Sequence, residues 1–247
     1  MENMSSRKML HEIYHNKIKK QPRKILPNNF TYRLIISVLD KYVKQKQRVL
    51  DIGCGAGTLS FYLADKVKSV TGIDISKKAV DACKETAVSL KIKNTHFKVL
   101  DFPSQKLSGI YDFIIFSEVI EHIPDDKLAL KDINKLLSPN GLLFISTPSI
   151  DAPLHRLGVT KDFDKRVGHV RRYSEKVLID LLEANGFKII EINKTEGIIR
   201  NFLFVDPAAG KFVRFVKYFL SDIITFLDNV TIPLFGFSNF IIVAGKK

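Results

Sequence analysis

The stretch that most constrains the fold is residues 48–58, Arg-Val-Leu-Asp-Ile-Gly-Cys-Gly-Ala-Gly-Thr, in which a short apolar run leads into three glycines at alternate positions. Apolar residues then recur at helical spacing over residues 59–67, so the pattern predicts a strand, a tight turn and a helix. Glycines let the backbone of such a turn approach a ligand closely, and the N-terminus of the next helix offers N–H groups. The stretch therefore predicts a ligand-binding turn.

The glycine spacing and one acidic residue indicate which ligand this turn binds. A dinucleotide fingerprint requires G-x-G-x-x-G, whereas here the glycines read G-x-G-x-G and Thr58 stands where the third glycine would be. Asp51, at the end of the predicted strand, would repel a pyrophosphate and attract a cationic ligand. S-adenosylmethionine fits better than NAD, because it carries a sulfonium and an ammonium while its carboxylate can use the helix N-terminus.

The rest of the chain alternates between predicted strands and helices. Strands are expected over residues 49–52, 69–73, 96–100, 111–116, 142–147, 187–192 and 238–244, and helices over 32–43, 59–67, 76–90, 125–137 and 174–184. Residues 139–141, Pro-Asn-Gly, predict a turn before the fifth strand. Alternation of this kind with continuously apolar strands predicts an α/β fold with a doubly wound, mostly parallel sheet.

Residues 49–57, Val-Leu-Asp-Ile-Gly-Cys-Gly-Ala-Gly, closely resemble motif I of the class I S-adenosylmethionine-dependent methyltransferases. The resemblance covers residues 45–195 well and the two ends poorly. It implies a Rossmann-like sheet of seven strands in the order 3-2-1-4-5-7-6 with the seventh antiparallel, S-adenosylmethionine as cofactor, and methyl transfer as activity.

Three acidic residues at predicted strand ends are candidates for holding the cofactor. Asp74 lies 23 residues beyond Asp51, near the interval at which an acid accepts hydrogen bonds from ribose hydroxyls; alternatively it caps the next helix, a role Ser76 could fill. The resemblance implies that Asp101 binds the adenine amino group and Phe102 covers the ring, unless Asp101 merely starts the next turn. The residues predicted to contact the cofactor are Asp51, Gly53, Cys54, Gly55, Gly57, Asp74, Ile75, Asp101, Phe102 and Ser117.

Glu118, Glu121 and His122 follow the fourth strand, where a methyl acceptor has to lie, and are the predicted catalytic residues. Two carboxylates and an imidazole this close could bind a divalent metal, Mg or Zn, that lowers the pKa of an acceptor hydroxyl. The Glu-x-x-Glu-His pattern resembles ubiquinone-biosynthesis O-methyltransferases and small-RNA 3′-end 2′-O-methyltransferases, in which a later histidine completes the metal shell. That likeness makes Glu118, Glu121, His122 and His169 the candidate ligands.

Two readings without a metal stay open for the same residues. His122 alone could accept the acceptor's proton, since its pKa is near neutral. Glu121 and His122 could also simply cap the loop.

Residues 148–173 form a long connection whose basic residues would suit an anionic group on the acceptor, or would simply form a solvated face; they are Lys161, Lys165, Arg166, Arg171 and Arg172.

The two ends of the chain differ from the central pattern. Residues 1–30 are predicted to be a basic arm, and residues 31–247 the methyltransferase domain, with residues 195–237 a helical, apolar insertion before the last strand. Residues 11–15 formally match H-E-x-x-H, but we interpret that match as coincidence. The apolar stripe over residues 205–235 is expected to cover the acceptor cleft or to contact a membrane peripherally.

Composition limits the partners and the compartment. A formal net charge of +13 favours nucleic acid, an anionic membrane surface or an anionic acceptor as a partner. Alternatively, it only reflects a proteome whose proteins are generally basic. Two cysteines form no disulfide framework, and the sequence shows no signal peptide or charge-free span, so we expect a cytoplasmic protein, with peripheral membrane contact as a variant. The oligomeric state stays open.

The sequence favours an enzyme that methylates a small-molecule or lipid-like acceptor, on oxygen before carbon or nitrogen. An RNA 2′-O-methyltransferase is the alternative, although no aromatic-basic stripe or RNA-binding module is evident. A membrane-surface or nucleic-acid-binding protein that keeps the cofactor fold as a scaffold is the non-enzymatic alternative.

Overall fold

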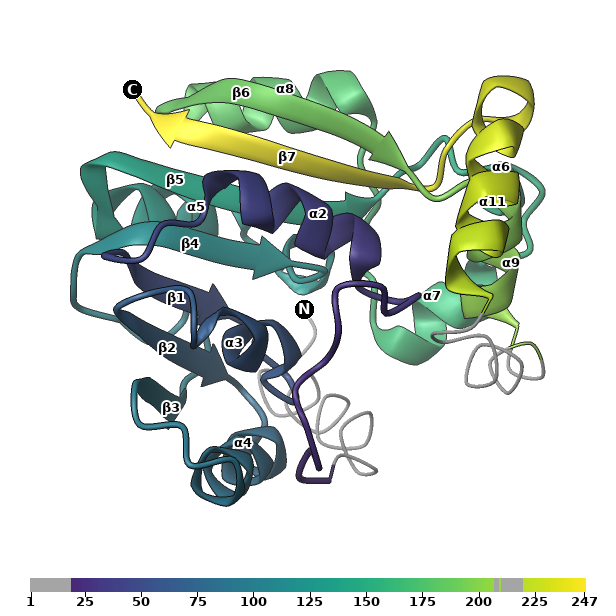
Figure 1. Cartoon of the computed structure of the whole chain (residues 1–247). Coiled ribbons are helices and arrows are strands. Elements are labelled where there is room, and N and C mark those ends of the chain that lie inside the picture. The colour runs from purple at the N-terminus through teal and green to yellow at the C-terminus, as the bar shows by residue number, and fades with distance from the viewer. Residues whose placement is uncertain (1–18, 207–208, 210–219) are drawn as a thin grey trace.

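The computed structural model describes residues 19–206, 209 and 220–247, and in this part of the chain the strands form a single seven-stranded sheet (Figure 1). The strand order is β3-β2-β1-β4-β5-β7-β6, and β7 is antiparallel to both of its neighbours. The strands are β1 (Arg48–Ile52), β2 (Ser69–Asp74), β3 (Thr95–Val99), β4 (Tyr111–Ser117), β5 (Leu137–Pro148), β6 (Phe187–Thr195) and β7 (Asn239–Lys246). The predicted fold class and strand order are confirmed.

Helices cover both faces of the sheet because successive strand residues point to opposite faces. In β4, Phe113 and Ile115 pack toward α2 (Arg33–Tyr42) and α3 (Thr58–Leu63). Ile114 and Phe116 pack on the other side. There they meet α5 (Asp126–Leu136) and α8 (Glu175–Ala184), and α4 (Lys77–Ser89) covers the β3 edge, as Figure 1 shows.

Two local predictions are wrong. The predicted turn at residues 139–141 lies inside β5, where Tyr111 pairs with Leu137 but Phe113 pairs with Leu142, so that the additional residues bulge out of the ladder. The connection over residues 148–173 was expected without helices, yet it contains α6 (Pro153–Arg156) and α7 (Lys161–Val167). Short helices of one or two turns carry little periodic signal, which explains the omission.

The insertion before β7 contains α9 (Ile198–Val205) and α11 (Ser221–Phe235), which pack against each other at one end of the sheet (Figure 1). Asp228 of α11 joins the two helices, because its buried carboxylate accepts hydrogen bonds from the N–H groups of Gly197, at 2.8 Å, and Arg200, at 2.9 Å. These are N–H groups that a helix start leaves without intrahelical partners. Phe212, Phe215, Val216 and Phe219 of the predicted apolar stripe lie outside the described residues.

Only the last part of the predicted N-terminal arm is described. Gln21 donates hydrogen bonds to the backbone oxygen of Ala56, at 2.6 Å, and to Thr58 Oγ1, at 3.2 Å, and Lys24 forms an ion pair with Asp65. This segment therefore lies against the glycine-rich turn. The H-E-x-x-H match falls outside the described residues, and the domain boundaries remain a prediction.

The close approach of α9 to α11 predicts a specific destabilisation. A Cβ on Gly197 would lie 2.2 Å from Thr231 Oγ1 and 2.4 Å from the backbone oxygen of Asp228, so Gly197→Ala forces the helices apart. We expect a loss of about 1–3 kcal/mol in the free energy of unfolding, measured with urea. In the control Gly245→Ala, the nearest atom is Ile190 Cδ1 at 3.3 Å, and we expect a much smaller loss. Equal losses would contradict this account.

Candidate functional site

One cavity of about 770 Å³ opens at the carboxyl ends of β1, β2, β4 and β5. This is the edge at which open parallel sheets bind ligands, and the volume is typical of a small-molecule site. The cavity is lined by all the predicted cofactor residues except Gly57, and also by Glu118, Glu121, His122 and His169. The structure thus brings the glycine-rich turn and the Glu/His loop to the same cavity.

The glycine-rich turn has the backbone conformation that its sequence predicts. Gly53, Gly55 and Gly57 all have positive φ, of 70°, 51° and 73°. A Cβ on Gly53 would lie 2.5 Å from a methyl carbon of Val119, so this turn also packs closely against the loop after β4. Gly57 begins α3 and packs on Phe61, which makes it a packing residue and not part of the cavity wall.

Asp51 is a buried carboxyl at the start of the turn. Ser60 Oγ donates a hydrogen bond to it at 2.5 Å. Burial raises the pKa of Asp51 to about 7, the Ser60 hydrogen bond opposes that rise, and the neighbouring carboxylate of Asp74 adds to it. A cation in the cavity would favour the ionised form of this carboxyl, as expected for a residue that faces a positively charged ligand.

Asp74 supports the turn from the end of β2. Its two carboxylate oxygens accept hydrogen bonds from the N–H groups of Gly55 and Ser76, both at 2.8 Å. Ser76 itself caps α4, since its Oγ accepts a hydrogen bond from the Ala79 N–H at 3.2 Å. Asp74 is therefore not the cap of that helix, and its contact with ribose hydroxyls remains a prediction.

The candidate adenine residues lie beside the turn that follows β3. Asp101 lines the cavity and also starts this turn, because its backbone oxygen accepts a hydrogen bond from the Gln105 N–H at 2.7 Å. Phe102 is buried and meets Phe116 edge to face, with ring centroids 6.4 Å apart. Both of the roles considered for Asp101 are compatible with this position.

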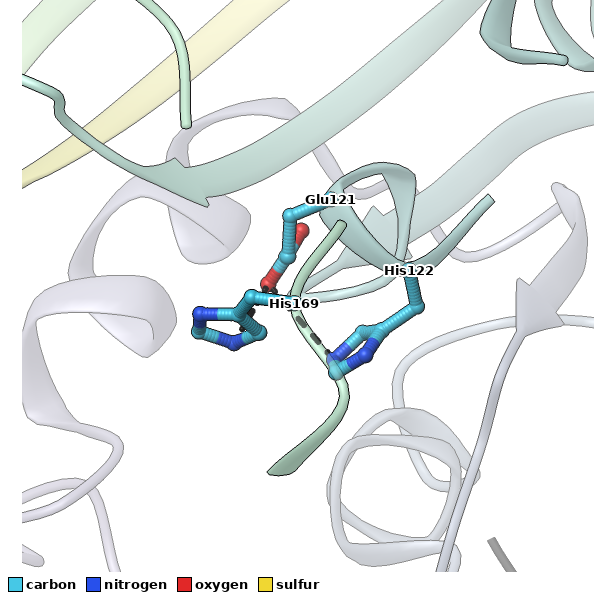
Figure 2. A group of neighbouring side chains, drawn as sticks. All are labelled: Glu121, His122 and His169. Carbon is cyan, nitrogen blue, oxygen red and sulfur yellow. Dashed lines mark ion pairs between the residues drawn. The ribbon is translucent and has the colours of Figure 1, made fainter. Parts of the chain in front are cut away.

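Glu121, His122 and His169 point toward one another in the cavity wall (Figure 2). The Glu121 side chain is fully buried, and its Oε2 accepts a hydrogen bond from Thr147 at 3.0 Å. Its Oε1 has no hydrogen-bond partner among the described residues, and lies 3.9 Å from His169 Nε2 and 4.0 Å from His122 Nε2. Burial, and the nearby charge of Glu118, raise the pKa of Glu121 well above its usual range.

The opposite nitrogens of both histidines are fixed by outer contacts. His122 Nδ1 lies 3.0 Å from the backbone oxygen of Gly168, and His169 Nδ1 lies 2.8 Å from Asp164 Oδ1. Since both partners accept hydrogen bonds, each Nδ1 carries a proton, and in the neutral imidazole this leaves a lone pair on each Nε2, the nitrogen nearer to Glu121. Burial alone would raise the pKa of Asp164, but hydrogen bonds from His169 and Arg172 outweigh this effect and hold that pKa well below its usual range.

The three converging atoms fit a divalent metal in chemistry and approximately in spacing. Two imidazole nitrogens and one carboxylate oxygen favour zinc over magnesium, which prefers oxygen ligands. Zinc bonds of about 2.0–2.1 Å place tetrahedral donors roughly 3.3–3.4 Å apart, whereas these three atoms lie within 4.8 Å of one another, so they must move closer together to bind the ion. The structure does not bring Glu118 into the group, because Glu118 Oε1 accepts hydrogen bonds from Ser146 at 2.7 Å and Asn239 at 2.9 Å.

Two of the five basic residues that were candidates for binding an anionic group are paired with carboxylates of the protein itself. Arg171 pairs with Asp126, and Arg172 donates to Asp164 through Nε, at 2.9 Å, and through Nη2, at 2.6 Å. Of the five basic residues considered, only Arg172 lines the cavity. The loop therefore uses Arg171 and Arg172 to hold its own fold around the histidines.

Several cavity residues were not identified from the sequence. They are Thr31, Tyr32, Phe163, Glu196, Asn201, Phe204, Ser238 and Asn239, which belong to the start of α2, to α7, to the insertion and to the start of β7. Asp164 was also missed as the partner of His169. The acid five residues before a candidate ligand was a usable signal, whereas nothing local marks the insertion residues.

Comparison with known proteins agrees with this fold and site. A family model described as a methyltransferase domain matches residues 23–192, and the chain belongs to this family. The structure also resembles an S-adenosylmethionine-dependent methyltransferase from Methanosarcina mazei, with a TM-score of 0.59 and 20% identity over 91% of this chain and 99% of the other. The predicted family, the methyltransferases, is confirmed by the family model, and the predicted Rossmann-like fold by the solved structure.

Two curated relatives carry a more specific name. The chain is 36% identical over 120 residues to a ubiquinone biosynthesis O-methyltransferase of Coxiella burnetii (strain Dugway 5J108-111), which covers 46% of this chain and 51% of that protein. It is 39% identical over 100 residues to the protein of the same name from Pelagibacter ubique (strain HTCC1062), over 40% and 41%. The matches thus span about half the length of these relatives or less.

The raised pKa of Asp51 predicts a pH dependence of cofactor binding. Below pH 7 the carboxyl is mostly protonated and must lose its proton to face a cation, so the affinity for S-adenosylmethionine should fall about tenfold from pH 8 to pH 6. Asp51→Asn should weaken binding and remove this dependence, whereas Asp180→Asn on exposed α8 should change neither. Calorimetry over this pH range measures both effects, and an unchanged pH profile in Asp51→Asn would contradict the assignment.

Proposed function

We propose that this protein transfers a methyl group from S-adenosylmethionine to a hydroxyl of a small-molecule acceptor. The observation that carries the proposal is the shared cavity, in which the glycine-rich turn and the group of Glu121, His122 and His169 face the same space. Similarity to relatives named ubiquinone biosynthesis O-methyltransferases supports oxygen as the acceptor atom.

The binding part of the site consists of acidic residues and backbone. S-adenosylmethionine supplies an activated methyl group on its sulfonium. In our proposal Asp51 offsets the positive charge of the methionine part, Asp74 accepts from the ribose hydroxyls, and Asp101 with Phe102 contacts the adenine. Holding both reactants in one cavity removes much of the entropic cost of their encounter.

The Glu/His group is proposed to bind a divalent metal, zinc before magnesium. A metal held there supplies positive charge that lowers the pKa of an acceptor hydroxyl. Glu121 and the two Nε2 atoms are the proposed ligands, and Asp164 orients His169 through Nδ1. In the metal-free alternative, His122 accepts the hydroxyl proton itself.

Transfer of a labelled methyl group to candidate acceptors tests the function directly. With radiolabelled S-adenosylmethionine we expect label in hydroxyl-bearing small molecules, most readily in compounds with two adjacent hydroxyls, and at least a tenfold loss after treatment with a chelator. Activity insensitive to chelation would favour His122 as the proton acceptor. Label in RNA only would contradict the proposed small-molecule acceptor. Cofactor binding without any turnover would contradict the hypothesis that the protein is an enzyme.

A pair of variants on α7 serves as the matched control. Asp164→Asn keeps the size of the side chain but weakens the hold on His169 Nδ1, and changes of this kind typically cost 10- to 100-fold in metal affinity or activity. Asp162→Asn makes the same chemical change at an exposed position two residues away. If the two variants were equally active, His169 would have no role in the reaction.

We also propose that α11 contacts a membrane surface or a lipid-like acceptor. No helix among the described residues is long and apolar enough to cross a bilayer. Nevertheless, one face of α11 exposes large apolar side chains at helical spacing; these are Ile223, Phe226, Leu227, Val230 and Leu234. The inner partner, α9, lines the cavity through Asn201, Phe204 and Val205, so the insertion serves as a cover and also presents an apolar outer face.

Vesicle co-sedimentation tests this contact. We expect the protein to bind anionic vesicles, and Phe226→Ser combined with Leu234→Ser to reduce binding roughly tenfold or more, because the two side chains are 68% and 73% exposed and available to lipid. Val88→Ser, at an equally exposed apolar position on α4, is the control. Binding that is unaffected by the double variant would exclude α11 as the contact.

A further inference from the structure

Two carboxylates in the cavity wall sit on strained backbone. Only three non-glycine residues in the described part of the chain have positive φ, and two of them, Glu118 (54°) and Glu196 (62°), line this cavity. A non-glycine residue in this region costs of order 1 kcal/mol or more and persists where the surroundings impose it, commonly at ligand sites. The strain therefore marks both carboxylates for a role beyond the fold.

Glu196 lacks the partners that a carboxylate of this kind usually has. Its side chain is 19% exposed and lines the cavity, and no hydrogen bond to its carboxylate is found among the described residues. Its one ionic partner in the described part of the chain is Arg200, whose Nη2 lies 3.8 Å from Glu196 Oε1, too far for a hydrogen bond. Burial raises the pKa of Glu196 to about 7; Arg200 opposes the rise, and the charges of Glu118 and Asp228 add to it.

Three neighbouring side chains in the same wall are also incompletely satisfied. Asn201 Oδ1, Ser238 Oγ and Asn239 Oδ1 are buried atoms without a hydrogen-bond partner in the described structure, and all three residues line the cavity. Asn201 is 8% exposed and Ser238 is 2% exposed. The orientation of the Asn239 amide is defined, since its Nδ2 donates to Glu118 at 2.9 Å. The three unsatisfied atoms are therefore two amide oxygens, which accept hydrogen bonds, and one hydroxyl, which can accept or donate, and the carboxylate of Glu196 adds further accepting oxygens.

This wall is held rigidly from behind. Arg200 is fully buried, donates through Nη2 to the backbone oxygen of Phe30 at 2.7 Å, and stacks on the Phe30 ring at 4.2 Å. Arg200 does not line the cavity, so its charge supports the wall and does not face a ligand directly. Unsatisfied acceptors on a fixed wall cost free energy unless a ligand donates to them.

We propose that Glu196, Asn201, Ser238 and Asn239 form a subsite that binds a hydrogen-bond-donating group of the methyl acceptor, a hydroxyl or a protonated amine. The proposal rests on the proposed function, because it places a second polar group of the same acceptor in the cavity of Glu121, His122 and His169. A carboxylate or phosphate on the methyl acceptor is disfavoured at this subsite, since it would meet the amide oxygens of the wall and the carboxylate of Glu196. Glu118 then acts as a positioning residue for Asn239.

Three probe compounds test the subsite: 1,2-dihydroxybenzenes that carry an aminomethyl, a hydroxymethyl or a carboxylate group at position 4. Binding is measured by calorimetry in the presence of S-adenosylhomocysteine, and turnover by methyl transfer. We expect both donor-bearing compounds to bind at least tenfold more tightly than the carboxylate, the difference that one hydrogen bond to a charged group makes.

Variants assign this preference to the wall. Glu196→Gln should weaken the aminomethyl compound most, by tenfold or more, and Asn201→Leu should weaken both donor compounds without touching the Glu196–Arg200 pair. Glu183→Gln makes the same change at an exposed position of α8 and should leave the binding of all three compounds unaltered. Cofactor affinity and thermal midpoints measured in parallel show whether each variant is folded.

The outcomes separate the subsite from the reaction. Equal binding of all three compounds, or tighter binding of the carboxylate, would overturn the subsite even if all are methylated. A preference for the donor compounds that Glu196→Gln and Asn201→Leu both leave intact would also overturn it. A preference that depends on these residues but leads to no methyl transfer would support the subsite and overturn the proposed O-methylation.

Discussion

The site depends on a buried carboxylate that the protein satisfies only in part. Glu121 Oε2 accepts a hydrogen bond from Thr147, but Oε1 has no hydrogen-bond partner among the described residues and faces the Nε2 atoms of His122 and His169, at 4.0 and 3.9 Å. An unsatisfied buried oxygen costs about 1–3 kcal/mol, and more when it is charged. Either a proton on the carboxyl or a cation between the three groups removes this cost, and the cation is the metal that we propose.

The surrounding chain is organised to keep that carboxylate in place. The Val170 N–H donates to the backbone oxygen of Glu121 at 2.9 Å, which joins the long loop after β5 to the turn after β4. Asp164 then holds His169 and Arg172, while Gly168 holds His122. Because β4 and β5 are parallel neighbours, their carboxyl ends bring both loops to one edge of the sheet, beside the glycine-rich turn.

Much of the fold followed from local patterns. Buried parallel strands are continuously apolar, as over residues 113–116 of β4, and the glycine turn has a distinctive spacing, so strands, helices and the cofactor edge were predictable. The strand order came from resemblance and was confirmed by the structure. The β5 bulge and the helices α6 and α7 were missed, because turn residues inside a ladder and helices of one or two turns lack a periodic signal.

The site was predictable only where its residues are close in sequence or belong to a known pattern. Glu121 and His122 are adjacent, His169 came from resemblance, and Glu118 was grouped with them by its spacing and by the same resemblance. The structure turns Glu118 toward Asn239, a residue 121 positions away. Glu196 and Asn201 reach the cavity through the packing of α9 on α11, and a single sequence gives no indication of that long-range contact.

Metal titration of the purified protein tests the central claim most directly. If Glu121, His122 and His169 form one site, calorimetry with zinc should show a single saturable ion per chain. The number of protons released should fall as the pH is raised, because the pKa of free Glu121 is held above its usual range. His169→Ala should abolish the binding, whereas His96→Ala, on β3, should leave it unchanged. Saturable binding that survives in His169→Ala, or no binding to the wild-type protein, would contradict the assignment.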